Sequence, residues 1–236
     1  MRGWVCLLPL VATACSGLEE LEGGVAAVEI HFPALPTLEV GEQVQLTARA
    51  LDAEGEVVDA AISWRASDIA LGVDPTGLVT GIQPGAASVQ AAVGSLTSER
   101  VGFTVLAPAD TLVIEGDSVL IVPAADPPAS TSLTVRLESR TPPGPAGPRP
   151  VVFEIITRPL AGASPAVQLT GGVQSDTVTS AADGTASVGL SLVSDQVAPD
   201  TAIVEVRATR TRGSAVPGSG QRFIALFQQE ASRRAP

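Results

Sequence analysis

Few residues of this sequence have side chains that could take part in chemistry. The densest group of them consists of four acidic residues in one short segment. Asp52, Glu54, Glu56 and Asp59 crowd one short segment around Gly55. Carboxylate oxygens are hard ligands that suit Ca²⁺. Their spacing does not match an EF-hand loop, and a polar turn between two strands has the same composition. We therefore predict a solvated turn and no resident metal, and keep calcium binding as a hypothesis.

The single histidine, His31, is the one candidate general base of the usual kind. A hydrolase or transferase needs a nucleophile, a base and a group that orients the base. The sequence has no Gly-x-Ser-x-Gly motif for a nucleophile, and one histidine cannot supply the ligands of a zinc site. The Gly-rich segment 213–220 lacks the Lys and the following helix of a phosphate-binding loop. We predict no enzyme, no catalytic residue and no cofactor.

Charge and length limit the possible partners and the number of domains. The chain has 236 residues and a formal net charge of −11. This acidity argues against nucleic acid as a partner, because phosphate binding needs a basic face. The length is enough for two domains of ordinary size. Aromatic residues make up only 3% of the chain, so the cores must consist mainly of Val, Leu, Ile and Ala.

The first 14 residues have the composition of a secretory signal peptide. Arg2 supplies a positive charge, residues 5–11 are apolar, and small residues follow at 12–14. The segment Ala-Thr-Ala-Cys that ends at Cys15 resembles the lipobox of bacterial lipoproteins, although Ala12 stands where Leu is preferred. That resemblance implies cleavage before Cys15 and lipidation of its thiol. The alternative is an ordinary signal peptide cut near Ala14 or after Gly17.

Cysteine usage fits the lipidated form. The only other cysteine, Cys6, would leave with the signal peptide, so no disulfide can form in the mature domains. Residues 15–26 are acidic and Gly-containing, and we interpret them as a tether between lipid and domain. The expected location is the cell envelope, with a lipid anchor on Cys15 in the outer membrane or at the cell surface. If the lipobox is not used, the chain is secreted.

Short alternating strands dominate the segment 41–105. Apolar residues at 44, 46, 48 and 50 alternate with others, which is the period of a half-buried strand. Ile62 and Trp64 point to one side, so we expect Trp64 to fill a core between two sheets. Turn signals such as Asp74-Pro75-Thr76-Gly77 recur between short strands, a spacing typical of an all-β sandwich.

The segment from about Val28 to Leu106 resembles the group 2 bacterial immunoglobulin-like domain. The matching features are Val40-Gly41-Glu42 before Gln45 to Ala48, Gly55, Trp64 with Ser67-Asp68, Gly77-Leu78-Val79-Thr80-Gly81, and Pro84-Gly85. The resemblance implies a Greek-key sandwich that serves as a spacer or adhesive module on bacterial surface proteins, without enzymatic activity.

A second series of strands follows a short linker at 107–110. We expect two strands in hairpin-like succession at 111–115 and 118–122, a stiff Pro-rich loop at 141–150, and strands at 131–139, 151–157, 185–193, 202–209 and 221–228. Val151-x-Phe153, Ala182-Asp183-Gly184-Thr185-Ala186 and Val204-x-Val206-x-Ala208 are similar to group 1, the invasin and intimin type of bacterial Ig-like domain.

The predicted organisation is all-β, with two tandem Ig-like Greek-key β-sandwiches. The order is signal peptide 1–14, tether 15–26, first domain 27–106, linker 107–110, second domain 111–228 and a disordered tail 229–236. The predicted function is that of a structural, adhesive or binding module with an unidentified protein or glycan ligand. Two alternatives stay open: an accessory subunit of an envelope complex that binds its partner by edge-strand pairing, and a carbohydrate-binding module.

Overall fold

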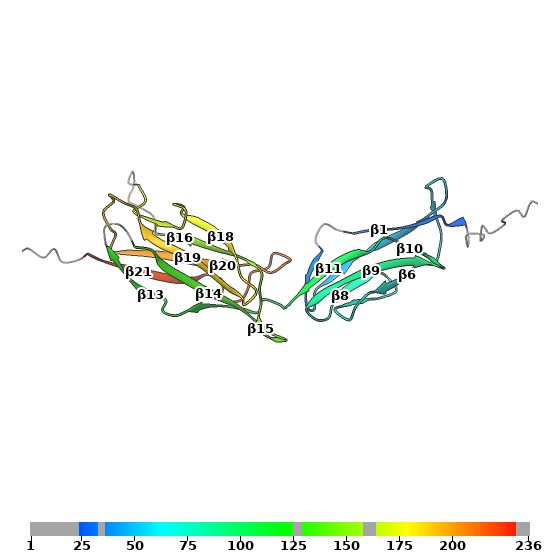
Figure 1. The fold of residues 1–236 in the computed structure, drawn as a ribbon, viewed down its shortest axis with the longest axis horizontal. Helices are drawn as coiled ribbons and strands as arrows, with labels where there is room; N and C mark the ends of the chain where they lie inside the picture. Colours follow the sequence, from blue (N-terminus) through cyan, green and yellow to red (C-terminus); the bar gives the residue numbers. More distant parts are fainter. Residues whose placement is uncertain (1–23, 33–35, 125–128, 158–163, 230–236) are drawn as a thin grey trace, which may run out of the picture.

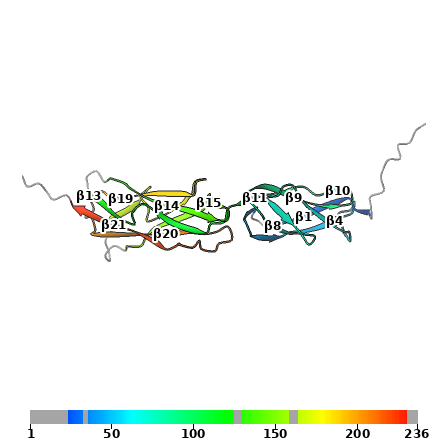
Figure 2. The same ribbon diagram turned by 90° about the horizontal axis from the view of Figure 1, so that it is seen from below.

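The protein folds into two β-sandwiches joined end to end (Figure 1). The structure, a computed structural model, describes residues 24–32, 36–124, 129–157 and 164–229. Every named element within these ranges is a strand. The view turned by 90° shows the same end-to-end arrangement (Figure 2). The predicted all-β class with two tandem β-sandwiches is confirmed.

The N-terminal sandwich contains one larger and two smaller sheets. The larger sheet has the order β10-β9-β11-β2, with β6 also paired to β9, and the smaller sheets have the orders β1-β4-β5 and β3-β8-β7. Their strands are β1 (Ala27–His31), β2 (Thr37–Glu39), β3 (Gln43–Gln45), β4 (Thr47–Leu51), β5 (Val57–Val58), β6 (Ser63–Ala66), β7 (Leu71–Val73), β8 (Leu78–Gly81), β9 (Gly85–Val93), β10 (Leu96–Thr97) and β11 (Val101–Leu106).

The strand expected at residues 44–51 changes its pairing partner at Leu46. β3 pairs with β8, while β4 pairs with β1 and β5. Leu46 lies between them, donates its N–H to the carbonyl of Gly77 at 2.9 Å, and is fully buried. The alternation of apolar residues is kept through this change, because Val44 and Ala50 are buried on the same side as Leu46.

Trp64 contributes to the core of the N-terminal sandwich but is only partly buried. Its side chain packs against both apolar clusters of this sandwich, one around Leu38 and Val79 and one around Val28 and Ala91. The interpretation that it fills a core between sheets is therefore correct in position, although one part of the indole stays at the surface.

The C-terminal sandwich consists of two five-stranded sheets. One has the order β12-β14-β19-β17, with β15 also paired to β14, and the other has the order β13-β21-β20-β16-β18. The first strand pairs in one sheet, and the second pairs with the last strand of the other sheet. The strands are β12 (Thr111–Glu115), β13 (Val119–Ala124), β14 (Thr131–Arg140), β15 (Pro143–Pro145), β16 (Pro150–Ile155), β17 (Val167–Leu169), β18 (Ser175–Thr179), β19 (Thr185–Leu192), β20 (Thr201–Ala208) and β21 (Gln221–Gln229).

Two expectations about this half are wrong. The strands at 111–115 and 118–122 do not form a hairpin: β12 pairs with β14, whereas β13 crosses to the other sheet and runs parallel to β21. The Pro-rich segment is not entirely loop, since β15 pairs with the end of β14. It does so at a sheet edge, where a strand without all its N–H donors is tolerated.

The core of the C-terminal sandwich is continuous and aliphatic with a few aromatic rings. Phe153 of β16 and Phe223 of β21 are its largest fully buried side chains, and the inward residues of β14, such as Leu133 and Val135, face them from the other sheet. β16 lies between β20 and β18 in its sheet, at the position where a strand was expected over residues 151–157.

Several predictions concern residues outside the described ranges. These are the signal peptide at 1–14, Cys15, the first part of the tether up to residue 23, and positions 230–236 of the expected tail. Gln229, which was assigned to the tail, is instead the last residue of β21. Within the described part of the chain, no helix is long and apolar enough to cross a membrane.

Candidate interdomain joint and surface sites

The two sandwiches meet at a buried ion pair between Glu39 and Arg149. Glu39 is the last residue of β2, and Arg149 precedes β16. The Arg149 Nε and Nη2 atoms both lie near Oε1 of Glu39, at 3.1 and 3.0 Å. The two side chains are only 1% and 2% exposed for Glu39 and Arg149. A carboxylate and a guanidinium are this deeply buried only when they are paired and hydrogen-bonded.

The linker completes the hydrogen bonding of this pair. The N–H of Ala109 donates to Glu39 Oε2 at 3.3 Å, and Arg149 Nη2 donates to the carbonyl of Ala107 at 2.9 Å. Arg149 Nη1 donates to the carbonyl of Pro148 at 2.9 Å. Among the described residues, no buried side-chain nitrogen or oxygen lacks a hydrogen-bond partner. The segment 107–110 is therefore fixed to both side chains of the ion pair.

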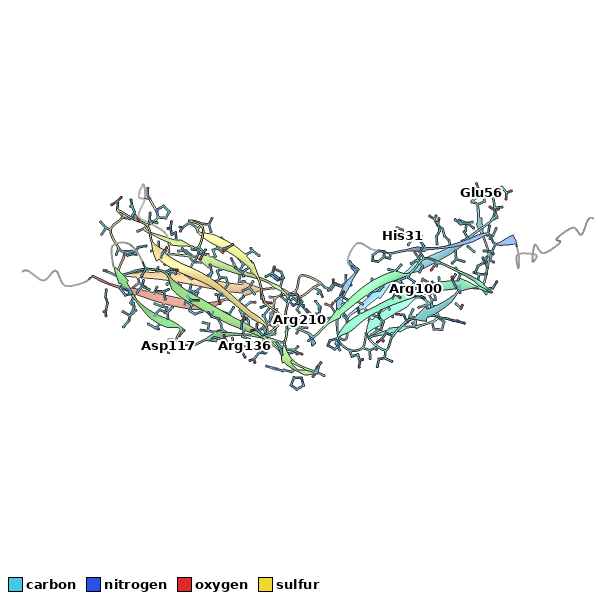
Figure 3. The ribbon with its side chains drawn as sticks, viewed as in Figure 1. His31, Glu56, Arg100, Asp117, Arg136 and Arg210 are labelled. Carbon is cyan, nitrogen blue, oxygen red and sulfur yellow. The ribbon has the colours of Figure 1, made fainter. Side chains whose placement is uncertain are left out.

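A second arginine holds the other side of the linker. Arg210 lies between the two sandwiches (Figure 3) and donates from Nε to the carbonyl of Ala109 at 3.0 Å. Its Nη2 atom is 2.9 Å from Oδ1 of Asp110, and its Nε atom is 3.9 Å from Oε2 of Glu39. Arg210 thus bridges the linker and the buried carboxylate.

Glu42 forms the rim of the joint. Its carboxylate accepts the backbone N–H of Glu39 at 2.8 Å and the hydroxyl of Thr211, and lies 3.9 Å from Nε of Arg212. We call Glu39, Glu42, Asp110, Arg149, Arg210 and Arg212 the joint cluster. It holds three carboxylates and three guanidiniums, so its charges balance in a chain that is strongly acidic as a whole.

Local backbone structure explains why these residues meet. β2 runs parallel to β11, with Glu39 opposite Leu106, so Glu39 lies beside the residue directly before the linker. Gly81 allows this approach: a Cβ there would be 2.7 Å from the carbonyl oxygen of Glu39. On the other side, Arg149 is held by Ser180, whose hydroxyl accepts the Arg149 N–H at 2.9 Å and whose N–H donates back at 2.8 Å.

Sequence reasoning missed the joint cluster. Glu39 and Arg149 are 110 positions apart, and each sits in a segment with no functional motif. The one local signal was the position of Glu39 directly after the inward-facing Leu38, in Thr37-Leu38-Glu39. A glutamate at such a strand end ordinarily faces solvent, so this signal did not indicate a buried charge.

The acidic loop forms a turn closed by its own aspartate. Asp52 Oδ1 accepts the backbone N–H groups of Glu54 and Glu56 at 3.0 and 2.8 Å. Figure 3 shows Glu56 at the end of the N-terminal sandwich that lies away from the joint. The described residues contain no group of three or more His, Cys, Asp or Glu side chains placed to hold a metal ion. The calcium hypothesis thus gains no support from the geometry.

The other predicted site residues are not brought together. His31 is exposed at the end of β1, an edge strand of its sheet, and points outward (Figure 3). Cys15, the predicted lipidation site, lies outside the described residues.

Two aspartates have perturbed acidity for a structural reason. The hydroxyl of Thr76 and the backbone N–H of Leu78 donate to Asp74 and lower the pKa of its carboxyl below the ordinary 3.8. The hydroxyl and N–H of Thr185 do the same for Asp183 and lower its pKa. Both are turn residues that stabilise the charged form by local hydrogen bonds, so they mark tight turns and no reactive site.

No protein-family model matches the chain, and no curated protein sequence is significantly similar to it. Solved structures that can be superposed include the Yersinia pseudotuberculosis adhesin InvE, with 16% identity over 88% of this chain and 61% of that chain and a TM-score of 0.42. Domains 4 and 5 of the S-layer protein SbsC match with 17% identity over 86% of this chain and 98% of that one, at a TM-score of 0.32. The D00-D0 domain of intimin matches with 15% identity over 84% and 99%, at 0.30. These scores are too low to assign a function.

Proposed function

We propose that this chain is a non-catalytic, lipid-anchored module of the bacterial cell envelope, in which two sandwiches form a rigid spacer that presents the C-terminal sandwich away from the membrane. The observation that carries the spacer part of the proposal is the buried Glu39–Arg149 pair, which closes the joint between the sandwiches. A flexible connection between independent modules has no need of such a pair.

The joint resists bending because bending would separate two buried charges. If the sandwiches tilt apart, the ion pair between Glu39 and Arg149 is broken, and the N–H of Ala109 in the linker loses its acceptor. Breaking a buried pair by removing one partner typically costs about 3–5 kcal/mol. Water that enters an opened joint would solvate both charges and recover much of this cost, so the pair specifies the geometry of the closed joint more than it adds net stability.

The ends of the molecule are placed as a spacer requires. The beginning of the described chain, which leads into β1, and the end of β21 lie at opposite ends of the molecule (Figures 1 and 2). A lipid on Cys15 would hold the N-terminal sandwich near the membrane, through a tether that spans at most about 40 Å when fully extended. The C-terminal sandwich then points away from the membrane surface.

The anchor is tested by the intact mass of the mature N-terminus, measured in membrane and soluble fractions beside a Cys15→Ser variant. We expect a chain that begins at Cys15 and carries acyl groups, found only in membranes, and a variant that loses both. An unmodified N-terminus in the culture medium would contradict the anchor. The joint is tested separately by the Glu39→Ala variant.

A second candidate function is that of an accessory subunit that binds by strand pairing. It is favoured by β13, a sheet edge of six residues with exposed apolar side chains. Co-purification of a stoichiometric envelope protein would support it. The carbohydrate-binding alternative has less support: among the described aromatic residues, Trp64 is half-buried, Phe32 packs against Phe103, and the remaining phenylalanines are in the core.

A further inference from the structure

In each sandwich the second strand runs parallel to the last one. β2 pairs with β11 over three residue pairs, and β13 pairs with β21 over six. Among the described strands these are the two parallel pairs, and the remaining pairs are antiparallel. We call the β2–β11 and β13–β21 pairs the parallel clamps.

The chain enters and leaves each clamp in opposite directions. β13 is connected at its start, through β12, to the linker at the joint, whereas β21 ends at the opposite end of its sandwich (Figures 1 and 2). Tension on the two ends of the chain therefore pulls β13 toward the joint and β21 away from it. In the other sandwich β1 pulls β2 away from the joint, while the linker pulls β11 toward it.

This geometry loads the hydrogen bonds of each clamp in shear. The two strands of a clamp are pulled lengthwise past each other, and the bonds between them lie across that direction. All bonds of a clamp must then yield together. A pair that is pulled apart from one end instead loses its bonds one after another, which needs less force.

The bonding of β13 to β21 follows from one printed contact. The carbonyl of Ser118 accepts the N–H of Ile224 at 2.7 Å. Backbone groups alternate in direction along a strand, so residues 120 and 122 also bond to β21, while Ile121 and Pro123 turn their backbone nitrogens to the open side. Proline has no N–H, and the one proline of β13 thus stands where the clamp needs no donor.

Apolar side chains cover this clamp on both faces. On the inner face Val122 is fully buried, and Leu120 packs against the core. On the outer face the register places Ile121 beside Leu226, and these side chains are 61% and 38% exposed. Water competes with protein groups for hydrogen bonds, so apolar cover on the outer face keeps it from bonds that are under load. This gives a role to apolar residues that stand at the surface.

We propose that this chain bears tension along its length and that the parallel clamps are the elements that resist it. The C-terminal clamp is the stronger one, because it has six pairs against three. That the load enters at Cys15 rests on the proposed anchor, and the load itself would come from whatever the C-terminal sandwich binds. The shear geometry of the clamps does not depend on either.

The clamps are tested by single-molecule pulling of the full chain with Cys6→Ser, held through Cys15 and a cysteine added after Pro236. Forced unfolding depends on the unfolding rate and not on the equilibrium stability. We expect two unfolding events that differ in released length, because the strands span residues 27–106 and 111–229. Fully extended, these spans are about 270 Å and about 400 Å long. The shorter event should need the lower force.

A proline scan of β13 tests the bonds of the C-terminal clamp. Leu120→Pro removes an N–H that bonds to β21, whereas Ile121→Pro, the matched control, removes one that faces the open side. We expect the force of the longer event to fall in Leu120→Pro and to remain native in Ile121→Pro. Leu120→Ala keeps the N–H and should lower the force less than Leu120→Pro. Native released lengths show that both sandwiches are folded in each variant.

The direction of pulling is tested with handles at Pro123→Cys and Gln228→Cys, in a chain with Cys6 and Cys15 replaced by Ser. These residues face each other across the clamp, so tension between them separates the strands from one end, and we expect a lower force than in end-to-end pulling. Equal forces in the two directions, a longer event at the lower force, or equal losses in Leu120→Pro and either of its two comparison variants would overturn the proposal. None of these readouts requires lipidation, so the proposed anchor fails or stands separately, by the mass of the N-terminus.

Discussion

Glu39 and Arg149 lie 110 positions apart in the sequence and meet with 3.0 Å between Oε1 and Nη2, almost fully buried where the two sandwiches join. Each belongs to a different sandwich, so the pair exists only when both are folded and in contact. Burial of an ion pair is costly, and its retention in proteins is often better explained by specificity than by net stability. Here the specified feature is the relative orientation of the two sandwiches.

We predict that Glu39→Ala opens the joint. The variant leaves the Arg149 guanidinium buried without its carboxylate, which costs about 3–5 kcal/mol if the joint stays closed. Opening lets water solvate the Arg149 guanidinium. The variant should therefore lose less stability than a closed joint would, and the two sandwiches should move more freely relative to each other. Small-angle scattering should show a broader distribution of distances than in the native chain, and urea unfolding should shift to lower denaturant.

The matched control is Glu29→Ala. Glu29 pairs with Arg49 at 3.4 Å on an exposed surface, where such pairs contribute about 0–1 kcal/mol. A Glu39→Ala chain with native scattering and stability would contradict a joint held by this pair.

We predict that Gly81→Ala disturbs the same joint through the backbone. The new Cβ would lie 2.7 Å from the carbonyl oxygen of Glu39 and 3.1 Å from Cγ1 of Val105, so β2 must shift away from β8. Overpacking of this kind typically costs about 1–3 kcal/mol. Gly102→Ala on β11 is the control, because nothing lies within 4 Å of its added Cβ. Equal unfolding midpoints for the two variants would contradict the predicted close approach.

The strands of this fold could be predicted because their signals are local. Alternation around Val44 and Ala50, and the turn at Asp183-Gly184, depend on residues that are close in sequence. Trp64 was placed in the right core for the same reason. Strand pairing was harder: β12 and β13 follow each other like a hairpin, but β13 finds its partner in β21, about a hundred positions later.

The joint cluster could not be predicted for a related reason. Burial of Glu39 depends on Arg149, on Arg210 and on the linker carbonyls and N–H groups, none of which has a recognisable spacing from it. A buried carboxylate is favourable only in the company of such partners. By contrast, the predicted acidic loop had a clear local signal, and that signal turned out to describe a turn closed by Asp52.

We predict that acid weakens the protein through the turns at Asp74 and Asp183. In the folded chain their pKa values are lowered, first by the hydroxyls of Thr76 and Thr185 and then by backbone N–H groups. A group whose pKa is lower in the folded state stabilises the fold above its unfolded pKa, near the ordinary 3.8, and this contribution is lost as the pH falls through the folded value.

Urea unfolding measured at pH 6, 4 and 3 checks this direction. Native stability should change little through these two groups between pH 6 and 4 and then decrease, because protonation removes their acceptor oxygens. The double variant Asp74→Asn and Asp183→Asn should be less stable at pH 6, with a shallower further loss toward pH 3. Thr76→Val is the control on one turn: it removes the largest cause of the Asp74 shift and should flatten part of the acid dependence. An acid dependence that is the same in all three chains would show that these turns do not determine it.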